Sequence, residues 1–190
     1  QLGTGAIEIK SGYGLSLEGE LKMLRVIKRL KDLNWIPVKS TFLGAHAVPK
    51  QFKDNKKGYI DHIINDMLPA ITKEKLADFI DVFCEKGVFS VEETRQILSA
   101  AKKYRFKLKL HAEQYNNLGS AELAASLDAV SADHLDNISE QGINALAASG
   151  VVAVLLPGVP FYLMEEKYAP ARKMIDAGCA VAIASDFNPG

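Results

Sequence analysis

Short apolar runs alternate with amphipathic stretches along the whole chain. The apolar runs predict strands over residues 6–12, 37–44, 79–85, 107–113, 129–134, 151–158 and 179–186. Between them, apolar residues recur at helical spacing over 16–30, 59–68, 90–104, 120–127, 139–150 and 169–178. Near-continuous apolar strands that alternate with amphipathic helices indicate a parallel sheet covered by helices.

Residue types at the ends of these stretches agree with helix boundaries. Glu20 lies in the first turn of the first helix, where the helix dipole favours negative charge. Gly150 and Gly178 stand where the last two helices end, and glycine suits a C-terminal cap. We expect the second helix to stop at Pro69, and we expect residues 54–59 to form a solvated polar loop.

Side chains with chemical function lie repeatedly at the ends of the predicted strands. These residues are Tyr13, His46, Glu85, His111, Glu113, His134 and Asp186. A (β/α)8 TIM barrel gathers its strand ends around one mouth, so such residues could converge there. An open doubly wound sheet would instead show a glycine-rich phosphate loop after its first strand, and residues 11–14 do not match GxGxxG. The pattern favours an α/β fold of the barrel type.

Length, composition and charge are those of an ordinary globular protein. The 190 residues are 48% hydrophobic and 24% charged, without a break in composition, which predicts one domain over 1–190. Lys plus Arg and Asp plus Glu balance at 23 each, so no nucleic-acid or membrane partner is expected. The two cysteines lie far apart, which predicts reduced thiols in a cytoplasmic protein.

Three of the four histidines follow or close a predicted strand. One histidine at a strand end is usually a hydrogen-bonded structural residue, and His62, in the middle of a helix, receives no role. His46, His111 and His134 together with Asp186 are harder to explain in that way. Imidazole and carboxylate groups suit zinc and iron, so the sequence predicts one divalent metal ion, zinc or iron.

Other polar residues near strand ends receive structural interpretations. Cys84 is expected to be a buried, inert thiol. Lys86 lies beyond the end of its strand and is expected to be solvated, which favours one metal ion over two. Glu113 is expected to satisfy neighbouring backbone groups or to support a metal ligand.

Several longer segments resemble the imidazolonepropionases of the amidohydrolase superfamily. They are EIKSGYGL, TFLGAHAVP, DVFCEKGVFS, LKLHAEQ, LGSAELAA, AVSADHL, LLPGVPFYL and YAPARKMIDAGCAVAIASDFNPG. The resemblance implies a metal-dependent (β/α)8 barrel enzyme, a hydrolase acting on carbon–nitrogen bonds in cyclic amides. Such an enzyme would convert 4-imidazolone-5-propanoate to N-formimidoyl-L-glutamate, a step of histidine degradation. The resemblance also implies that it would form a homodimer.

The resemblance also implies roles for individual residues. The metal would be held by His111 and Asp186, while His134 and Asp186 would be catalytic. In the implied mechanism, a metal-activated water attacks the ring carbonyl, and Asp186 passes the water's proton to the leaving nitrogen. The implied substrate-binding residues are Tyr13, His46, Gln114, Asn188 and Gly190.

The sequence departs from the family pattern at two places. The family's first two metal ligands form an HxH pair on the first strand, and this sequence has no HxH. We therefore expect the chain to cover strands two to eight, without the first strand and without the segments of the flanking β-sandwich. Gln114 stands where some members carry glutamate. Because an amide cannot act as a base, Gln114 is given a binding role.

Two other readings remain open at this point. Another amidohydrolase, such as a guanine or adenosine deaminase, would share His111, His134 and Asp186. TFLGAHAVP and SDFNPG argue against it, because they resemble substrate loops and not only metal ligands. The second reading is a non-enzymatic barrel or binding scaffold, or an inactive fragment that lacks the HxH ligands.

Overall fold

The computed structural model describes residues 3–188, which divide into two compact units. The first unit runs up to Phe83 and includes Glu93–Leu108. The second comprises Cys84–Glu92 and the residues from Lys109 onward. Within this described part, no helix combines the length and the apolar character needed to cross a membrane. The prediction of one domain over residues 1–190 stays a prediction.

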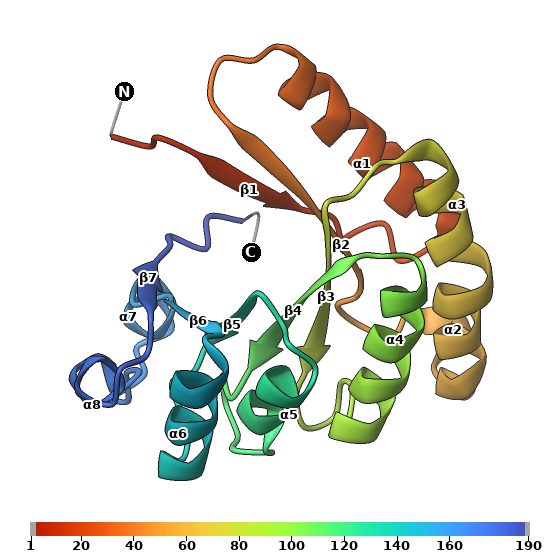
Figure 1. The fold of residues 1–190 in the computed structure, drawn as a ribbon. Coiled ribbons are helices and arrows are strands. Elements are labelled where there is room, and N and C mark those ends of the chain that lie inside the picture. The colour runs from red at the N-terminus through yellow and green to blue at the C-terminus, as the bar shows by residue number, and fades with distance from the viewer. Residues whose placement is uncertain (1–2, 189–190) are drawn as a thin grey trace. The chain divides into compact units, whose positions relative to one another are not determined.

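The first unit is built on parallel strands that follow one another in chain order. They are β1 (Ile7–Lys10), β2 (Val38–Ala45) and β3 (Phe79–Cys84). Ile7 lies opposite Val38, and Thr41 lies opposite Phe79. The accompanying helices are α1 (Leu17–Asp32), α2 (Lys56–His62), α3 (Leu68–Glu74) and most of α4 (Val91–Lys103), in the red to yellow-green part of Figure 1.

The α1 helix begins and packs as its sequence predicts. Ser16 is the N-cap, and its hydroxyl accepts the N–H of Gly19 at 3.2 Å. Leu21, Leu24 and Ile27, spaced three residues apart, are the buried apolar face of the helix. A helix with one apolar face covers the sheet and keeps its charged residues in solvent.

The prediction that the second helix stops at Pro69 is wrong. A π-helical turn (Ile63–Met67) joins α2 directly to α3, and Pro69 lies in the first turn of α3. A proline is tolerated there, because a first-turn N–H needs no partner within its helix. The N–H of Leu68 donates to the carbonyl of Ile63, so the backbone continues without a break.

The stretch 54–59 is also more structured than expected. Asn55 is the N-cap of α2, and its side chain accepts the N–H of Gly58 at 3.0 Å. Tyr59 is fully buried, and its hydroxyl donates to the carbonyl oxygen of Gly44 at 2.7 Å. The stretch therefore starts a helix and contributes an aromatic side chain to the core.

The second unit continues the same alternation. Its parallel strands are β4 (Lys107–Ala112), which begins in the first unit, β5 (Ser131–His134), β6 (Val152–Leu155) and β7 (Val181–Ile183). Its helices are α5 (Ser120–Ser126), α6 (Glu140–Ser149), α7 (Gly158–Tyr162) and α8 (Ala171–Asp176). The α7 helix was not expected. Gly150 and Gly178 follow their helices with φ of 73° and 89°, which confirms their capping role.

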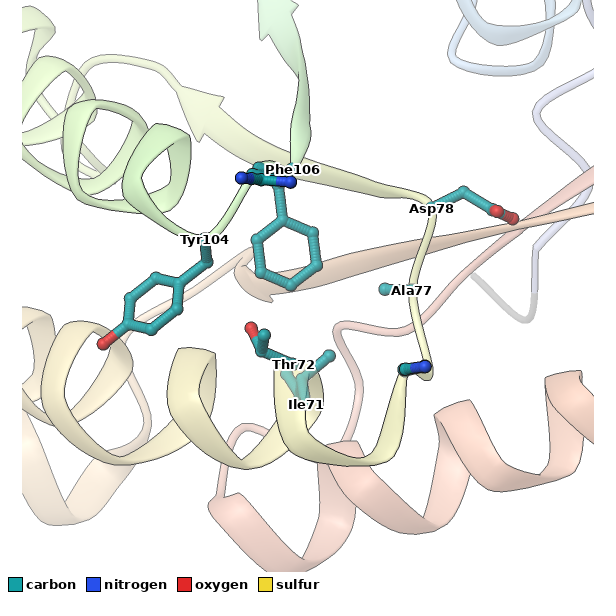
Figure 2. A pocket seen from close by; sticks show the side chains of 8 residues that line it. Ile71, Thr72, Ala77, Asp78, Tyr104 and Phe106 are labelled. Atoms are coloured by element: carbon teal, nitrogen blue, oxygen red, sulfur yellow. The ribbon is translucent and has the colours of Figure 1, made fainter.

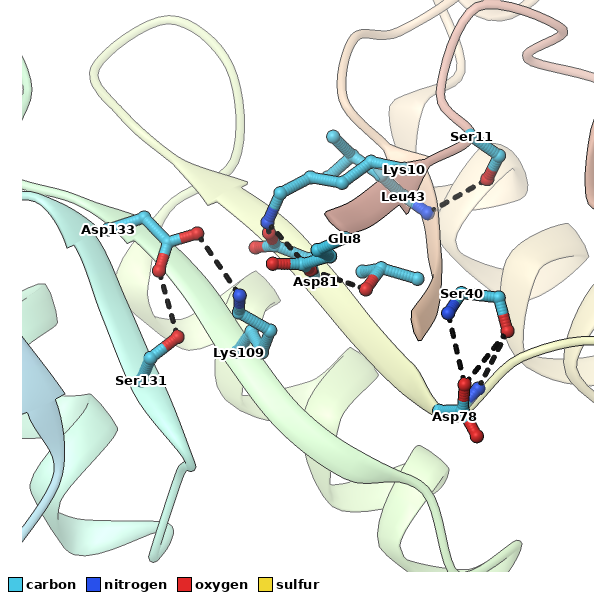
Figure 3. A network of polar contacts seen from close by, with 11 residues as sticks. Glu8, Lys10, Ser11, Ser40, Leu43, Asp78, Asp81, Lys109, Ser131 and Asp133 are labelled. Atoms are coloured by element: carbon cyan, nitrogen blue, oxygen red, sulfur yellow. Dashed lines mark hydrogen bonds and ion pairs between the residues drawn. The ribbon is translucent and has the colours of Figure 1, made fainter. Parts of the chain in front are cut away.

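Charged side chains form buried or half-buried pairs among the strands of each unit (Figure 3). In the first unit, Nζ of Lys10 lies 2.5 Å from Oδ2 of Asp81 and 3.2 Å from Oε1 of Glu8. In the second unit, Nζ of Lys109 lies 3.5 Å from Oδ2 of Asp133, and Oδ1 of Asp133 accepts the hydroxyl of Ser131. Buried charges of this kind are tolerated because each is paired.

The first unit contains a small cavity of about 160 Å³ near the start of β3 (Figure 2). Its walls come from α3 and from the segments that precede β3 and β4, namely Ile71, Thr72, Lys75, Ala77, Asp78, Tyr104, Arg105 and Phe106. The residues selected from the sequence follow the strand ends instead. The cavity therefore does not belong to the candidate site.

Candidate functional site

The structure brings Tyr13 and His46 together at the ends of β1 and β2. Their rings lie edge to face, with centroids 5.4 Å apart and an interplanar angle of 73°. Nδ1 of His46 lies 3.0 Å from the carbonyl oxygen of Gly12. Because a carbonyl oxygen can only accept, Nδ1 carries the proton in this contact, and Nε2 is the acceptor nitrogen of that tautomer.

The loop that carries Tyr13 is held by Glu20, which is fully buried. Its carboxylate accepts the N–H of Gly12 at 3.0 Å, of Gly14 at 2.9 Å and of Leu15 at 2.9 Å. The helix-dipole interpretation of Glu20 missed this role. The only signal in the sequence was the pair of glycines, Gly12 and Gly14, which indicates a tight loop. Gly12 is needed there because a Cβ at this position would lie 2.8 Å from the backbone oxygen of Leu43.

In the second unit, His111 near the end of β4 lies beside His134 at the end of β5. Their ring centroids are 5.1 Å apart, and the two residues are only 8% and 1% exposed. His111 lies opposite Asp133, so strand alternation alone would turn His134 to the other face. His134 has φ of 79°, a left-handed conformation that breaks the alternation.

Backbone hydrogen bonds hold this unusual conformation. The N–H of Leu135 donates to the carbonyl of Ala112 at 3.0 Å, and the N–H of Asn137 donates to that of Glu113 at 2.8 Å. Left-handed conformations at non-glycine residues are costly and persist where the surroundings determine them. The conformation turns the imidazole of His134 toward that of His111.

Glu113 has the structural role that the sequence suggested. It is fully buried, and its carboxylate accepts the N–H of Leu118 at 2.9 Å and the N–H and hydroxyl of Ser120 at 2.6 and 2.9 Å. It therefore ties the end of β4 to the start of α5. The interpretations of two neighbours are confirmed as well: Cys84 is a buried thiol without a disulfide, and Lys86 is exposed.

Three further predicted site residues, Gln114, Asp186 and Asn188, lie on loops of the second unit. Nε2 of Gln114 donates to the hydroxyl of Tyr115 at 3.0 Å. The side chain of Asn188 donates to the backbone carbonyl of Asp186 at 2.8 Å, and Asp186 has φ of 50°. Gly190 lies outside the described residues.

Several acidic side chains act electrostatically on Tyr115, in the loop after β4. Burial raises the pKa of Tyr115, and the negative charges of Glu165, Glu85, Asp186 and Asp136 raise it further. The carboxylate of Asp186 thus lies within electrostatic range of the loop that carries Gln114.

Two residues of the second unit offer the donor atoms that the predicted metal needs. The imidazole of His111 and the carboxylate of Asp186 are donors that zinc and iron both accept, so this donor set fits the ion. The carboxylate that the structure does bring close to His111 was not selected from the sequence, and Asp186 is not part of that group. A carboxylate oxygen of Asp133 lies within 4.8 Å of a ring nitrogen of His111. Only the pairing of β4 with β5 reveals this proximity.

A cavity of about 290 Å³ adjoins the ends of β5, β6 and β7 and contains one buried carboxyl group, that of Asp136. The rest of its lining is mainly apolar: Leu155, Leu156, Pro157, Tyr168, Ala169, Ala171 and Ile183. Oδ1 of Asp136 accepts the N–H of Ala169 at 3.1 Å. Burial nevertheless raises the pKa of Asp136 to about 6.

This raised pKa predicts that the contribution of Asp136 to the stability of the chain falls as the pH rises from about 4 to about 6. In the unfolded chain an aspartate loses its proton near pH 3.9, about the usual value, whereas folded Asp136 keeps it up to about 6. The folded state therefore binds more protons in this window, and raising the pH favours unfolding, by up to about 3 kcal/mol.

Urea unfolding of Asp136→Asn over the same pH range measures this contribution. With rising pH, the free energy of unfolding of the variant should fall less, or rise more, than that of the parent chain. Asp176→Asn, at an exposed position of α8, is the matched control and should keep the parent's slope. Equal slopes in the parent and Asp136→Asn would contradict the prediction.

No family model matches the chain, but curated proteins match it along its full length. It is 57% identical over 189 residues to an imidazolonepropionase of Parabacteroides distasonis, covering 100% of this chain and 45% of the relative. It is 50% identical over 188 residues to an imidazolonepropionase of Thermoanaerobacter pseudethanolicus, covering 99% and 45%. The chain thus spans a little under half the length of these relatives.

Solved structures share the fold at low sequence identity. A guanine deaminase from C. acetobutylicum with bound guanine aligns with a TM-score of 0.70 and 15% identity, covering 97% of this chain and 47% of that one. An adenosine deaminase from Xanthomonas campestris with bound zinc aligns with a TM-score of 0.65 and 15% identity, covering 97% and 42%.

Together these findings confirm the predicted fold class. It is α/β, of the TIM-barrel type found in metal-dependent amidohydrolases, and the chain accounts for part of that fold. The segments on which the resemblance rested extend over nearly the whole sequence, as do the alignments. Over essentially their whole length, the 190 residues are similar to about 45% of the length of imidazolonepropionases, with 50% and 57% identity.

Proposed function

We propose that the protein to which these residues belong hydrolyses the cyclic amide of 4-imidazolone-5-propanoate to N-formimidoyl-L-glutamate, a step of histidine degradation. The observation that carries the proposal is the identity of 50% and 57% with named imidazolonepropionases over essentially every residue of the chain. Buried imidazoles of His111 and His134, 5.1 Å apart at neighbouring strand ends, support a hydrolytic site.

A divalent metal ion, zinc or iron, belongs to the proposal. When bound, such an ion polarises a carbonyl group and lowers the pKa of water to about 7. His111 and Asp186 would hold it, and a structural relative with bound zinc supports a divalent metal.

Proton transfer and charge stabilisation are assigned to two residues of the chain. Asp186 takes a proton from the attacking water and delivers it to the ring nitrogen that leaves as the amide bond breaks. His134, buried at the end of β5, orients the water and stabilises negative charge on the carbonyl oxygen.

The substrate's polar groups would be bound by the other strand-end residues. His46 can accept a ring N–H through Nε2, since Nδ1 donates to Gly12. Tyr13, beside it, presents a hydroxyl group from a side chain that is 47% exposed. Gln114 and Asn188 offer amide donors, and Gly190 is proposed to add a backbone contact.

The proposal also covers assembly and location. The protein is proposed to form a homodimer in the cytoplasm, with the small-molecule substrate as its partner and with no nucleic-acid or membrane partner. Buried thiols at Cys84 and Cys179 without a disulfide support a reducing compartment. Light scattering of the purified full-length protein measures the assembly.

An exchange experiment tests the activity. The 190 residues of this chain replace the matching segment of the Parabacteroides distasonis imidazolonepropionase, and the resulting hybrid protein is loaded with zinc or ferrous iron. We expect it to convert 4-imidazolone-5-propanoate to N-formimidoyl-L-glutamate, because the relative supplies the rest of the barrel. Guanine and adenosine serve as control substrates. A folded, metal-loaded hybrid that leaves the imidazolone intact, or that deaminates a control instead, overturns the proposal.

A further inference from the structure

The turn after β4 is held by a carboxylate from the neighbouring segment, that of Glu85. This residue directly follows β3 and is only 3% exposed. Its Oε2 accepts the backbone N–H of Tyr115 at 2.9 Å and that of Asn116 at 3.3 Å. Its Oε1 accepts the N–H of Lys86 at 2.7 Å and the side-chain amide of Asn116 at 2.8 Å. Both oxygens are therefore occupied by donors.

The backbone of Glu85 is itself fixed. Its N–H donates to the carbonyl of Phe89 at 3.1 Å, and its own carbonyl accepts the N–H of Val88 at 3.0 Å. Phe89 is fully buried, so this short loop is anchored in the core. Because its backbone is fixed in this way, the Glu85 carboxylate is held in one position. Hydrogen bonds to a charged acceptor are also stronger than those between neutral groups.

Asn137 holds the same turn from the side of β5. Its side-chain amide donates to the carbonyl of Gln114 at 2.7 Å, and its own carbonyl accepts the side chain of Asn117 at 3.1 Å. The backbone of residues 114–116 is thus held by Glu85, after β3, and by Asn137, after β5, and the side chain of Asn117 adds a further contact. The side-chain amide of Gln114 itself donates a hydrogen bond to the hydroxyl of Tyr115.

We propose that Glu85 is a positioning residue, which holds the 114–116 turn so that the Gln114 carboxamide is presented to the substrate three residues beyond His111. The inference rests on the proposed function, because it gives Gln114 a binding role. Glu85 acts through the backbone N–H groups of the turn and needs no contact with the substrate.

The first test measures the turn directly and needs no activity. Glu85→Gln keeps the shape of the side chain, but its NH2 group must face N–H donors at one end of the contact. Hydrogen exchange of the Tyr115 and Asn116 amides in the full 190-residue chain should accelerate at least about tenfold in this variant. Glu140→Gln, at the exposed start of α6, should leave it unchanged.

The second test measures coupling in the active hybrid. Glu85→Gln should raise KM about tenfold or more with a smaller change in kcat, and Gln114→Ala should do the same. If Glu85 acts through Gln114, the double variant should be no worse than Gln114→Ala by more than about twofold. Multiplicative effects, or a KM that Gln114→Ala does not change, would overturn the inference.

The two readouts separate this inference from the proposed function. Unchanged exchange at Tyr115 and Asn116 in Glu85→Gln refutes the positioning role, whatever the hybrid hydrolyses. Faster exchange in Glu85→Gln, together with a hybrid that fails to hydrolyse the imidazolone, shows that Glu85 holds the turn, while the substrate assignment and the binding role of Gln114 are withdrawn.

Discussion

Asp186→Asn in the active hybrid should lower imidazolone hydrolysis by at least about 1,000-fold, within the range that a catalytic proton carrier contributes. Asparagine has the same shape as aspartate, but its amide cannot take up a proton at neutral pH. It is also a weaker metal ligand than a carboxylate, so kcat and metal content should both be measured. The fold should survive, because Asp186 is not part of the core.

The control for this change is Asp176→Asn, the same substitution at an exposed position on α8. It should keep the activity within about twofold of the parent, as expected for a surface residue away from the site. Circular dichroism and thermal unfolding should agree among the parent and both variants. More than a tenth of the parent's turnover in Asp186→Asn would rule out its role as proton carrier.

Glu113→Gln should have the largest effect on stability, lowering the free energy of unfolding by about 3 kcal/mol. Oε1 of Glu113 accepts two donors of Ser120, and Oε2 accepts the N–H of Leu118. Whichever end of the glutamine amide bears the nitrogen, a buried donor then faces another donor. Urea unfolding of the parent and the variant measures the loss.

Glu166→Gln, on an exposed loop, is the matched control and should change the free energy of unfolding by less than about 0.5 kcal/mol. Metal binding provides a second comparison. Because Glu113 contacts the backbone and not the proposed ion, the remaining folded protein should bind zinc as the parent does. A loss of less than about 1 kcal/mol would mean that the start of α5 does not depend on this carboxylate.

The strands and most helices could be predicted because burial leaves a periodic trace in the sequence. Continuous apolar runs gave β2 and β4, and regular leucine spacing gave α1. Pro69 misled the prediction because a proline stops a helix in its interior but is tolerated in a first turn. The π-helical turn just before Pro69 could not be predicted, because it produces no periodic pattern of apolar residues in the sequence.

The candidate site could be predicted only where its residues carry chemistry at strand ends. His111 and His134 were found in this way, and the structure places them side by side. Asp133 was missed, since its proximity to His111 depends on the register of two strands. Glu20 was assigned to a helix dipole and Glu85 was selected only as a strand-end residue. Their roles in holding loops were missed, because the N–H groups that they accept lie on loops, which have no periodic pattern in the sequence.

The buried glutamates also bear on how such a site can change. Glu20 and Glu85 accept hydrogen bonds from main-chain N–H groups. The conformation of each loop therefore depends little on the side chains that the loop carries. Tyr13, Gln114 and Tyr115 could then be exchanged for other residues while the loops keep their course. A barrel built in this way can acquire new substrates by altering what its loops present, with the framework beneath them left intact.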